Sequence, residues 1–414
     1  MFRPVLNQLK RVSLTAWIFI GIILGILSGI MLGETIIPVA EIIGGLFLRL
    51  LTMVIIPLIF TSITSGVLGI GTSKNLGRLG LKTMAYYVAS SLIAILTGLL
   101  LVNIIKPGVG AELGLTTDVN TSDITAGGLG DILYRIVPNN LISSMANGEI
   151  LPIIFFCLIL GAFISKLNDR HRILMTDFFN AGFEVMMSIT HFIIWFAPLG
   201  VFGLIAKVTA TTGLEVFRSL GWYFLTVLAA LFWHYLINLP ILVIALSKEN
   251  PLKHFKNMGI ALITAFTTSS SSATLPLTLE CAEKNAGISN KISSFVLPLG
   301  ATVNMDGTAL YECVAVMFIA QVYGIELNFA AQFTVVITAL LASIGAAGIP
   351  MAGLVMMSIV LKAVGLPLEG IGLILAVDRI LDMIRTSTNV WSDSCGALII
   401  AKSEGEINNP AVSS

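Results

Sequence analysis

Long apolar runs separated by short polar or basic segments make up the first two thirds of the chain. About 20 apolar residues suffice for a helix that crosses a bilayer. We place six spans here, at residues 14–32, 42–68, 83–105, 150–164, 183–208 and 220–246. Lysine and arginine cluster before the first span and after alternate later ones, which marks the cytoplasmic side. The amino terminus is therefore expected in the cytoplasm.

Beyond residue 257 the apolar runs become short. Two of them flank a polar tip at residues 267–274, with basic residues at both outer ends, which predicts a hairpin that enters the membrane and returns. Residues 292–322 read as a span broken at TVNMDGT, and residues 329–364 as a second hairpin around a glycine-rich middle at 343–353. Non-helical backbone at this depth needs protein or a wet cavity to satisfy it. Two such units in opposite orientation are typical of inverted-repeat transporters.

The last apolar segment, residues 371–401, carries five charged side chains. A charge at the bilayer centre costs about 2.5–3.5 kcal/mol on the translocon scale, so such groups face protein or water. At about 100° per residue, its polar residues share about a third of the helix circumference. They are Asp378, Asp382, Arg385, Thr386, Asn389 and Asp393. This stripe predicts the centre of a binding site.

The composition narrows the class of protein. Of the 414 residues, 56% are hydrophobic and 11% charged, against about 25% charged in soluble domains, which indicates a polytopic membrane protein. The net charge of zero argues against nucleic-acid binding. The four cysteines lie singly in apolar surroundings and the histidines are scattered, so neither a zinc site, a disulfide framework nor any other cofactor is expected.

An enzyme is one alternative class of protein to consider, because residues 269–272 are all serine. An intramembrane serine hydrolase would need a nearby base, and we expect His191, His234 and His254 to lie outside the segments that carry the motifs. A GxSxG elbow is also missing. The chain is therefore not expected to be an enzyme.

Arg385 is the sharpest candidate ligand. A guanidinium group grips a carboxylate in bidentate fashion, and Asp382, one turn away, suits an ammonium group. Oxygen-bearing side chains of Asn304, Asp306, Asn389 and Asp393 suit a hard cation such as Na⁺. The alternative for each set is structural, as a buried ion pair or as satisfied polar core residues.

Glu312 lies one turn beyond the break in the seventh span. Burial favours the neutral form of a carboxyl group, so Glu312 could carry a proton during transport, or could be a permanent hydrogen-bond partner. The serine run at residues 269–272 and the glycine-rich run at 343–353 are either inert linkers or hairpin tips that bind an anionic group and act as a gate.

Four motifs carry a family resemblance: TTSSSSATLP, PLGATVNMDGTALYE, ASIGAAGIPMAG and DRILDMIRTSTNVWSD. With these in this order, the chain resembles the glutamate/aspartate transporter family, the dicarboxylate/amino acid:cation symporters, over its whole length. The short loops favour a prokaryotic member. The resemblance implies an all-α membrane protein of eight transmembrane segments plus two re-entrant hairpins, an inverted-repeat, elevator-type homotrimer.

The resemblance also implies a domain division. Residues 1–82 and 108–215 would form the scaffold, and residues 83–107 and 216–414 the mobile transport domain. Within the latter, hairpin 1 would cover about 257–285 and hairpin 2 about 329–364.

The same resemblance assigns roles residue by residue. Arg385 would bind the side-chain carboxylate of the substrate and Asp382 its ammonium group. Further substrate contacts would come from Ser270, Ser271, Thr308, Ile349, Gly353, Thr386 and Asn389.

Three Na⁺ sites are implied. The first would use Gly300, Asn304, Asn389 and Asp393, and the second Tyr87, Ser90, Ser91, Asn304 and Asp306. The third, built mainly from backbone, would use Thr302, Met305, Ser343, Ile344 and Ala346.

This chain departs from the family pattern at a few positions. Archaeal members have an arginine where this chain has Ser269, and eukaryotic members have one at the position of Met383. Here the extra arginine is Arg379, one turn earlier, and we assign Arg379 and Ser269 a gating or auxiliary role. Glu312 matches the proton-carrying glutamate of eukaryotic members. Ala346 replaces an archaeal threonine, which weakens the third Na⁺ site.

We therefore expect a symporter that takes up glutamate or aspartate with Na⁺ and H⁺ across the cell (plasma or inner) membrane, with both termini cytoplasmic. A carrier of C4-dicarboxylates would not need Asp382, and a carrier of neutral amino acids would not keep Arg385. An anion channel is the alternative from another class. The expected partners are the small-molecule substrate, Na⁺, the lipid bilayer and two further copies of the chain.

Overall fold

The computed structural model describes residues 14–69, 74–111, 137–213, 216–344 and 352–407. In these ranges the regular structure is helical, and the one β contact is an isolated bridge between Ile288 and Ile407. The predicted all-α fold is therefore confirmed.

The first helices follow the predicted apolar runs. Helix α2 covers Leu14–Leu32 and is joined by a 3-10 turn, Gly33–Ile36, to α3 at Ile37–Gly69. The apolar stretch of 53 residues from Ala16 to Leu68 is about 80 Å long at about 1.5 Å per residue. Because a bilayer core is about 30 Å thick, this length contains two crossings. Helix α4 runs over Lys74–Ile105.

The prediction of one continuous helix for the fifth span is wrong, because the structure has two helices here. After α7 (Leu141–Asn147) and α8 (Ile150–Ile164), the chain forms α9 at Asp169–Ile194 and α10 at Ala197–Thr212, bent by 53°. Pro198 lies in the first turn of α10, where the missing amide hydrogen of proline costs nothing and its fixed φ favours a new helix. The apolar run is continuous across this bend and hides it.

The sixth span contains a π turn. Helix α11 covers Val216–Trp233, the π turn η2 covers His234–Asn238, and α12 covers Leu239–Ser247. Pro240 has no amide hydrogen to bond the carbonyl four residues earlier. The ladder widens instead, and the Leu239 amide donates to the carbonyl of His234, five residues back.

Hairpin 1 is present as predicted. Helix α13 (Pro251–Thr268) and helix α14 (Ser271–Glu280) pack against each other, and a π turn at Cys281–Asn285 follows. At the tip, Ser269 has a φ of 51°, and the Ser270 hydroxyl accepts a hydrogen bond from the Ala273 amide. The two serines thus end one helix and start the next.

The broken span and the last helix also match the sequence. Helix α15 (Asn290–Val303) and helix α16 (Asp306–Val322) meet at the predicted break. Hairpin 2 consists of α17 (Phe329–Ile344) and α18 (Ala352–Ala363), with its tip outside the described residues. Helix α19 (Ile371–Glu404) has 34 residues, enough to span a bilayer at about 1.5 Å per residue.

By length and apolar composition alone, four helical stretches of the described residues can cross a membrane. They are residues 16–68, 78–105, 218–247 and 290–322, and the bent pair α9–α10 makes a fifth. Helix α19 is absent from this set because its polar stripe lowers its mean hydropathy. Its burial inside the protein, described below, explains how it tolerates that stripe.

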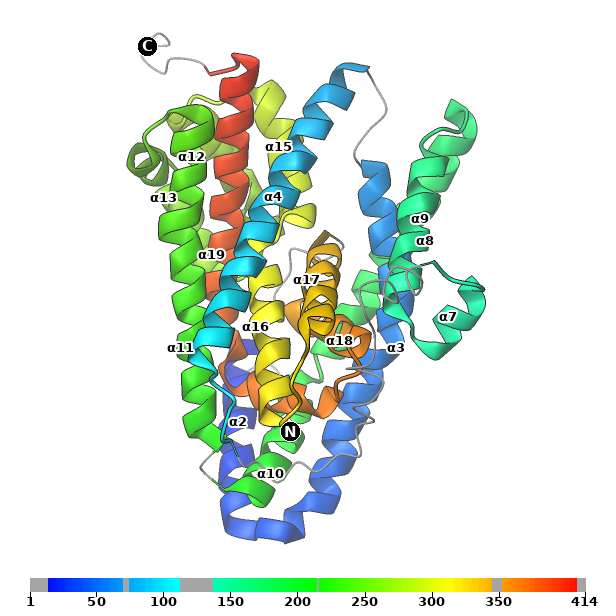
Figure 1. The fold of residues 1–414 in the computed structure, drawn as a ribbon, viewed down its shortest axis with the longest axis vertical. Helices are drawn as coiled ribbons and strands as arrows, with labels where there is room; N and C mark the ends of the chain where they lie inside the picture. The colour runs from blue at the N-terminus through cyan, green and yellow to red at the C-terminus, as the bar shows by residue number, and fades with distance from the viewer. Residues whose placement is uncertain (1–13, 70–73, 112–136, 214–215, 345–351, 408–414) are drawn as a thin grey trace, which may run out of the picture.

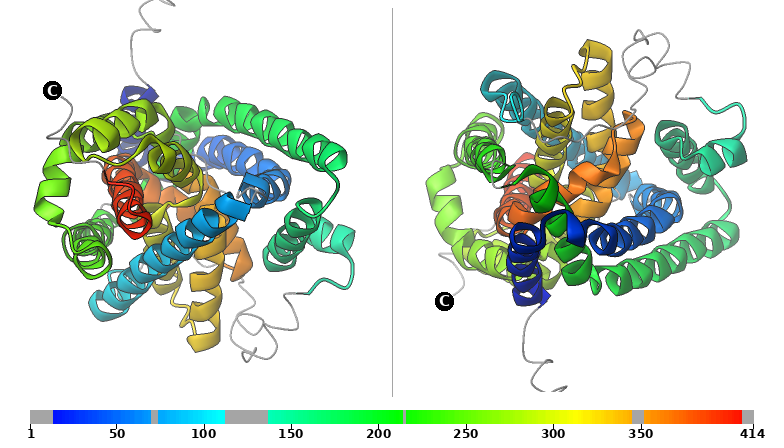
Figure 2. Two further views of the ribbon diagram at one scale, coloured as in Figure 1. Left: turned by 90° about the horizontal axis from the view of Figure 1, so that it is seen from above. Right: turned by 90° about the horizontal axis from the view of Figure 1, so that it is seen from below.

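The helices fall into two groups by packing. In the first group α10 packs on α2 and α3, and α3 packs on α8 and α9. In the second group α4 packs on α11 and α16, and α19 packs on α13, α15 and α16. Figure 1 shows α19 beside α11 to α13 on one side and α3, α8 and α9 on the other, and Figure 2 shows the same division from both ends.

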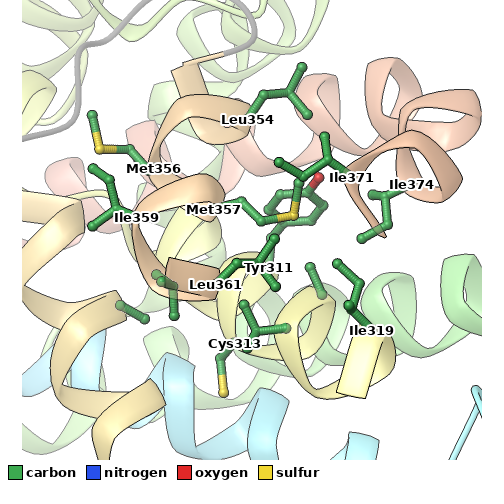
Figure 3. Packing of buried hydrophobic residues seen from close by; sticks show 14 of the residues in the cluster. Tyr311, Cys313, Ile319, Leu354, Met356, Met357, Ile359, Leu361, Ile371 and Ile374 are labelled. Carbon is green, nitrogen blue, oxygen red and sulfur yellow. The ribbon is translucent and has the colours of Figure 1, made fainter. Parts of the chain in front are cut away.

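A continuous apolar core joins the two groups. It includes residues of α2, α3 and α10 together with residues of α16 to α19. Figure 3 shows its part around Tyr311 of α16, which lies among Leu354 and Met357 of α18 and Ile371 of α19. This packing holds the buried polar groups of α16 and α19 away from lipid.

Ion pairs gather where α19 ends. Glu404 pairs with Arg78 and Lys82 of α4 at 2.5 and 2.6 Å, and Lys402 pairs with Glu249 at 2.6 Å. Hydrogen bonds from Lys82 and Arg78 hold the pKa of Glu404 below its usual value. The basic start of α4 and the segment after α12 thus lie at the same end of the molecule as the end of α19.

Candidate functional site

The polar stripe of α19 faces the interior of the second helix group. Asp378 and Arg385 are each 1% exposed, and the other stripe residues are also buried. Two neighbouring polar clusters occupy this face: an arginine cluster around Arg385, and an acidic cluster around Asp306 and Asp393.

In the arginine cluster, Arg385 is held from three sides. Its Nη1 donates to Asp378 Oδ1 at 3.1 Å and its Nη2 to Asp382 Oδ1 at 2.7 Å. Arg379 Nη1 donates to the other oxygen of Asp382 at 3.2 Å. The guanidinium carbon lies 3.8 Å from the centre of the Tyr311 ring, a cation–π contact. The side chain is therefore fixed in position before any ligand arrives.

The charges of the arginine cluster balance. Two carboxylates, Asp378 and Asp382, face two guanidinium groups, Arg379 and Arg385. The third acid of the predicted stripe, Asp393, belongs to the other cluster. In this conformation Asp382 is engaged by both arginines, so a ligand ammonium group would have to exchange with them.

Two glycines bring other elements against Arg385. A Cβ atom on Gly353, at the start of α18, would lie 2.9 Å from Arg385 Nη2. A Cβ atom on Gly307, in the first turn of α16, would lie 2.8 Å from the Arg385 carbonyl oxygen. Both are closer than real Cβ contacts, so α16 and hairpin 2 approach α19 only because these residues lack side chains.

Asn389 joins α19 to the start of α16. The Gly307 amide donates to Asn389 Oδ1 at 2.8 Å, and Asn389 Nδ2 donates to Thr308 Oγ1 at 3.2 Å. The Thr386 hydroxyl bonds the Asp382 carbonyl of its own helix at 2.8 Å. Two predicted substrate ligands, Thr386 and Asn389, therefore lie within about one helical turn of Arg385 on α19. A third, Thr308 of α16, is bonded to Asn389.

In the acidic cluster, Asp306 is surrounded by donors. Its Oδ1 accepts from Ser91 at 2.6 Å and Ser90 at 3.2 Å, both on α4. Its Oδ2 accepts from Ser392 of α19 at 2.6 Å and contacts Nε2 of His234 at 3.1 Å. All five residues are fully or almost fully buried.

Asp393 is linked to Asp306 through Asn304. Asn304 Nδ2 donates to Asp393 Oδ1 at 2.8 Å and to Ser392 Oγ at 3.0 Å. A Cβ on Gly300 would lie 2.5 Å from Asp393 Oδ1, so the acid reaches the helix α15 backbone only because residue 300 is glycine.

The acidic cluster lacks a strong positive counter-charge. Within the described residues, neither Asp306 nor Asp393 pairs with a lysine or arginine, and the donors around them are hydroxyl, amide and imidazole groups. Buried carboxylates require compensation by an opposite charge. Hydroxyl and carboxylate oxygens are the ligands that hard cations take, so this cluster suits a small cation.

Glu312 has a distinct environment. Its side chain is fully buried on α16, and neither carboxyl oxygen has a hydrogen-bond partner among the described residues. A charged carboxylate in such surroundings is costly. The site therefore suits the protonated form, or a partner that arrives during the transport cycle.

Several other predicted residues lie elsewhere or cannot be placed. Thr302 is exposed and bonds only the Leu299 carbonyl of its own helix, and Ser343 likewise bonds the Leu340 carbonyl. Ala346 and Ile349 lie outside the described residues. The third predicted Na⁺ site thus stays a prediction, with Met305 at the helix break and Ile344 at the end of α17 as its other members.

Tyr87 is buried near the acidic cluster, and the serines of hairpin 1 are buried as well. The Tyr87 hydroxyl donates to the Val296 carbonyl at 2.7 Å, and a Cβ on Gly300 would lie 2.7 Å from that hydroxyl. At the hairpin tip Ser269, Ser270 and Ser271 are buried. Their predicted contacts to substrate stay predictions.

Two histidines contradict the expectation that they lie outside the motif-bearing core. His234 contacts Asp306, and His254 stacks on Trp391 while its Nε2 lies 3.0 Å from the Ser394 carbonyl oxygen. Each contacts a residue far away in sequence, 72 positions for His234 and 140 for His254, so spacing gives no sign of this. Ser392, by contrast, lies next to Asp393 inside the motif at residues 378–393, and the predicted ligand sets do not include it.

The fold and these clusters define a helical membrane protein with a buried, charged binding region on broken helices. Comparison with protein families identifies the class. The model of the sodium:dicarboxylate symporter family matches residues 14–403. The chain belongs to the sodium:dicarboxylate symporter family, and it is a transporter and not an enzyme.

Individual relatives support the same assignment. The chain is 37% identical to excitatory amino acid transporter 3 of Mus musculus, over 98% of this chain and 89% of the relative. It is 39% identical to the Homo sapiens protein of that name, over 90% of this chain and 80% of the relative. With Homo sapiens excitatory amino acid transporter 2 the identity is 37%, over 94% and 79%.

The acidic cluster yields a prediction about stability. Replacing Ser392 by alanine removes one bond to Asp306 and one from Asn304, so it should cost about 1–3 kcal/mol. Ser394→Ala is the matched control, because Ser394 is equally buried on α19 but its hydroxyl bonds groups of its own helix, the Trp391 carbonyl and the Cys395 side chain. Thermal unfolding of the purified protein without Na⁺ should show a larger loss for Ser392→Ala. Equal losses would contradict the bridging role of Ser392.

Proposed function

We propose that this protein takes up L-glutamate and L-aspartate together with Na⁺ and protons, by moving its second helix group relative to its first. Family membership establishes a sodium-coupled symporter class. The named relatives are transporters of excitatory amino acids. The arginine cluster is the observation that carries the choice of substrate.

Arg385 is the buried cation that a second carboxylate requires. It is fixed by Tyr311 and by two aspartates, and hairpin 2 contacts it through Gly353. An acidic amino acid offers a carboxylate to Arg385 and an ammonium group to Asp382. The ligand thus replaces ion pairs that already exist, and the buried charges stay compensated during the exchange.

Cation coupling follows from the overall charge. An acidic amino acid carries a net charge of −1, and it enters beside Asp306 and Asp393, which have no lysine or arginine partner among the described residues. Na⁺ bound by these carboxylates and by Ser90, Ser91 and Asn304 oxygens would compensate that charge. The ions and the substrate then favour each other's binding through Gly307 and Asn389, which border both clusters.

Proton coupling rests on Glu312. A carboxyl group that is fully buried without a hydrogen-bond partner is stable in its neutral form. A proton carried by Glu312 would let the carboxyl group stay beside a substrate that is itself anionic.

The two packing groups support the proposed division into a scaffold (residues 1–82 and 108–215) and a transport domain (83–107 and 216–414), except that α4 of the second group already begins at Lys74. Hairpins α13–α14 and α17–α18 belong with α19 in the second group. The ion pairs at the end of α19 place it beside the basic segments, which supports a cytoplasmic carboxyl terminus in the cell membrane. The homotrimer is proposed from the family resemblance.

The substrate assignment predicts a specific loss. Arg385→Gln should abolish accumulation of labelled L-aspartate and L-glutamate in liposomes with an inward Na⁺ gradient, because the substrate carboxylate loses the buried guanidinium group that binds it. Arg218→Gln, on an exposed position of α11, is the control and should transport normally.

The other candidate functions give different results in that assay. Competition by succinate with no transport of amino acids would indicate a dicarboxylate carrier, and Na⁺-driven uptake of alanine a neutral one. Flux that never exceeds the outside concentration would indicate a channel. Full accumulation by Arg385→Gln would refute the proposed substrate site.

Glu312 yields a separate prediction. With the Na⁺ gradient fixed, acidification outside the liposome should raise accumulation by the unchanged protein, since a proton enters with each substrate. Glu312→Gln should transport without this response, because glutamine mimics only the neutral carboxyl group. A pH response that survives in Glu312→Gln would remove Glu312 from the proton pathway.

A further inference from the structure

His234 opens the π turn between α11 and α12 and is completely buried. Its Nε2 lies 3.1 Å from Asp306 Oδ2. The two residues are 72 positions apart in sequence. Neither the motifs nor the predicted Na⁺ sites include this histidine.

A chain of hydrogen bonds fixes the tautomer of His234. The Thr97 hydroxyl donates to the Ile93 carbonyl at 2.7 Å, so it accepts from Asn238 Nδ2 at 2.8 Å. The same Nδ2 lies 3.3 Å from His234 Nδ1. Because that amide nitrogen can only donate, Nδ1 must accept, and in the neutral ring the proton lies on Nε2, where it points at Asp306.

The π turn makes this arrangement possible. It begins at His234 and ends at Asn238, and it exists because Pro240 cannot complete the regular helical ladder. Such turns often occur at functional sites. Here the turn directs one ring nitrogen of His234 at Asp306 and keeps the other on Asn238.

The four groups that contact Asp306 differ in whether they can also bind a cation. Ser90, Ser91 and Ser392 have hydroxyl groups, which can rotate and offer an oxygen lone pair to an incoming cation. The Nε2–H group of His234 has no lone pair to offer while it donates. It is therefore the one of these four neighbours that must keep holding the carboxylate after the ion has bound.

We propose that His234, locked by Asn238 and Thr97, is a positioning residue that orients the Asp306 carboxylate for Na⁺. This inference rests on the proposed Na⁺ site. Groups that orient a metal ligand in this way typically change metal affinity about 10–100-fold when removed. His234 thus acts on ion coupling without contacting the ion or the substrate.

The test measures Na⁺ affinity without substrate, from the rise in melting temperature of the purified protein as Na⁺ is added. His234→Leu should raise the half-saturating Na⁺ concentration about tenfold or more. Asn238→Leu should raise it less, because the ring remains but its tautomer is no longer fixed. His234→Gln should restore part of the affinity, since its amide group can still donate to Asp306.

A purely structural role would give another pattern. Asn103→Leu removes a comparable half-buried amide on α4, which bonds Gln332 at 3.1 Å, and serves as the control for general destabilisation. It should lower the melting temperature at every Na⁺ concentration without shifting the half-saturation point. For the His234 variants, L-aspartate affinity at saturating Na⁺ should stay unchanged.

Asp306→Asn distinguishes failure of the Na⁺ site from failure of the positioning role of His234. If it leaves Na⁺ affinity intact, the proposed Na⁺ site itself fails. If it weakens Na⁺ while His234→Leu and Asn238→Leu do not, only the positioning role fails. Should His234→Leu not fold, an unshifted Na⁺ affinity in both Asn238→Leu and His234→Gln would overturn the proposal.

Discussion

Compensation of buried charge governs the second helix group. Its last helix carries Asp378, Asp382, Arg385 and Asp393 in surroundings that exclude water, and isolated charges there would cost several kcal/mol each. In the arginine cluster the charges compensate one another, because two aspartates pair with two arginines. In the acidic cluster they do not, since Asp306 and Asp393 have no lysine or arginine partner among the described residues. This asymmetry is what makes one cluster suited to an anionic substrate and the other to cations.

The break between α15 and α16 links the two clusters. Asn304 and Asp306 at the break serve the acidic cluster, while Gly307 and Thr308 in the next turn contact Asn389 and the Arg385 backbone. A continuous helix would direct these groups around its circumference and leave no backbone amide for Asn389. Because both clusters share this short segment, a cation that orders one of them also orders the other, which is a physical basis for coupled binding.

Much of this fold was predictable from apolar run length and polar interruptions. The residue pattern gave the ends of α2 and α8, both hairpins and the shared face of the α19 residues. Three features were not accessible. The bend between α9 and α10 lies within an unbroken apolar run. The π turn depends on Pro240, and a proline at this position is equally compatible with the ordinary start of a new helix. Contact of His234 with Asp306 joins distant segments. Ser392 is different: at about 100° per residue it lies only about 20° outside the predicted stripe, so a wider arc would have included it.

In the proposed site, ions and substrate bind beside one another and compensate each other's charge. The decisive measurement is equilibrium binding of L-aspartate to the purified protein over a range of Na⁺ concentrations. We expect the affinity to rise with more than the first power of Na⁺ concentration, and potassium or choline at equal ionic strength to have no such effect. An affinity for L-aspartate that does not depend on Na⁺ would contradict the proposed site.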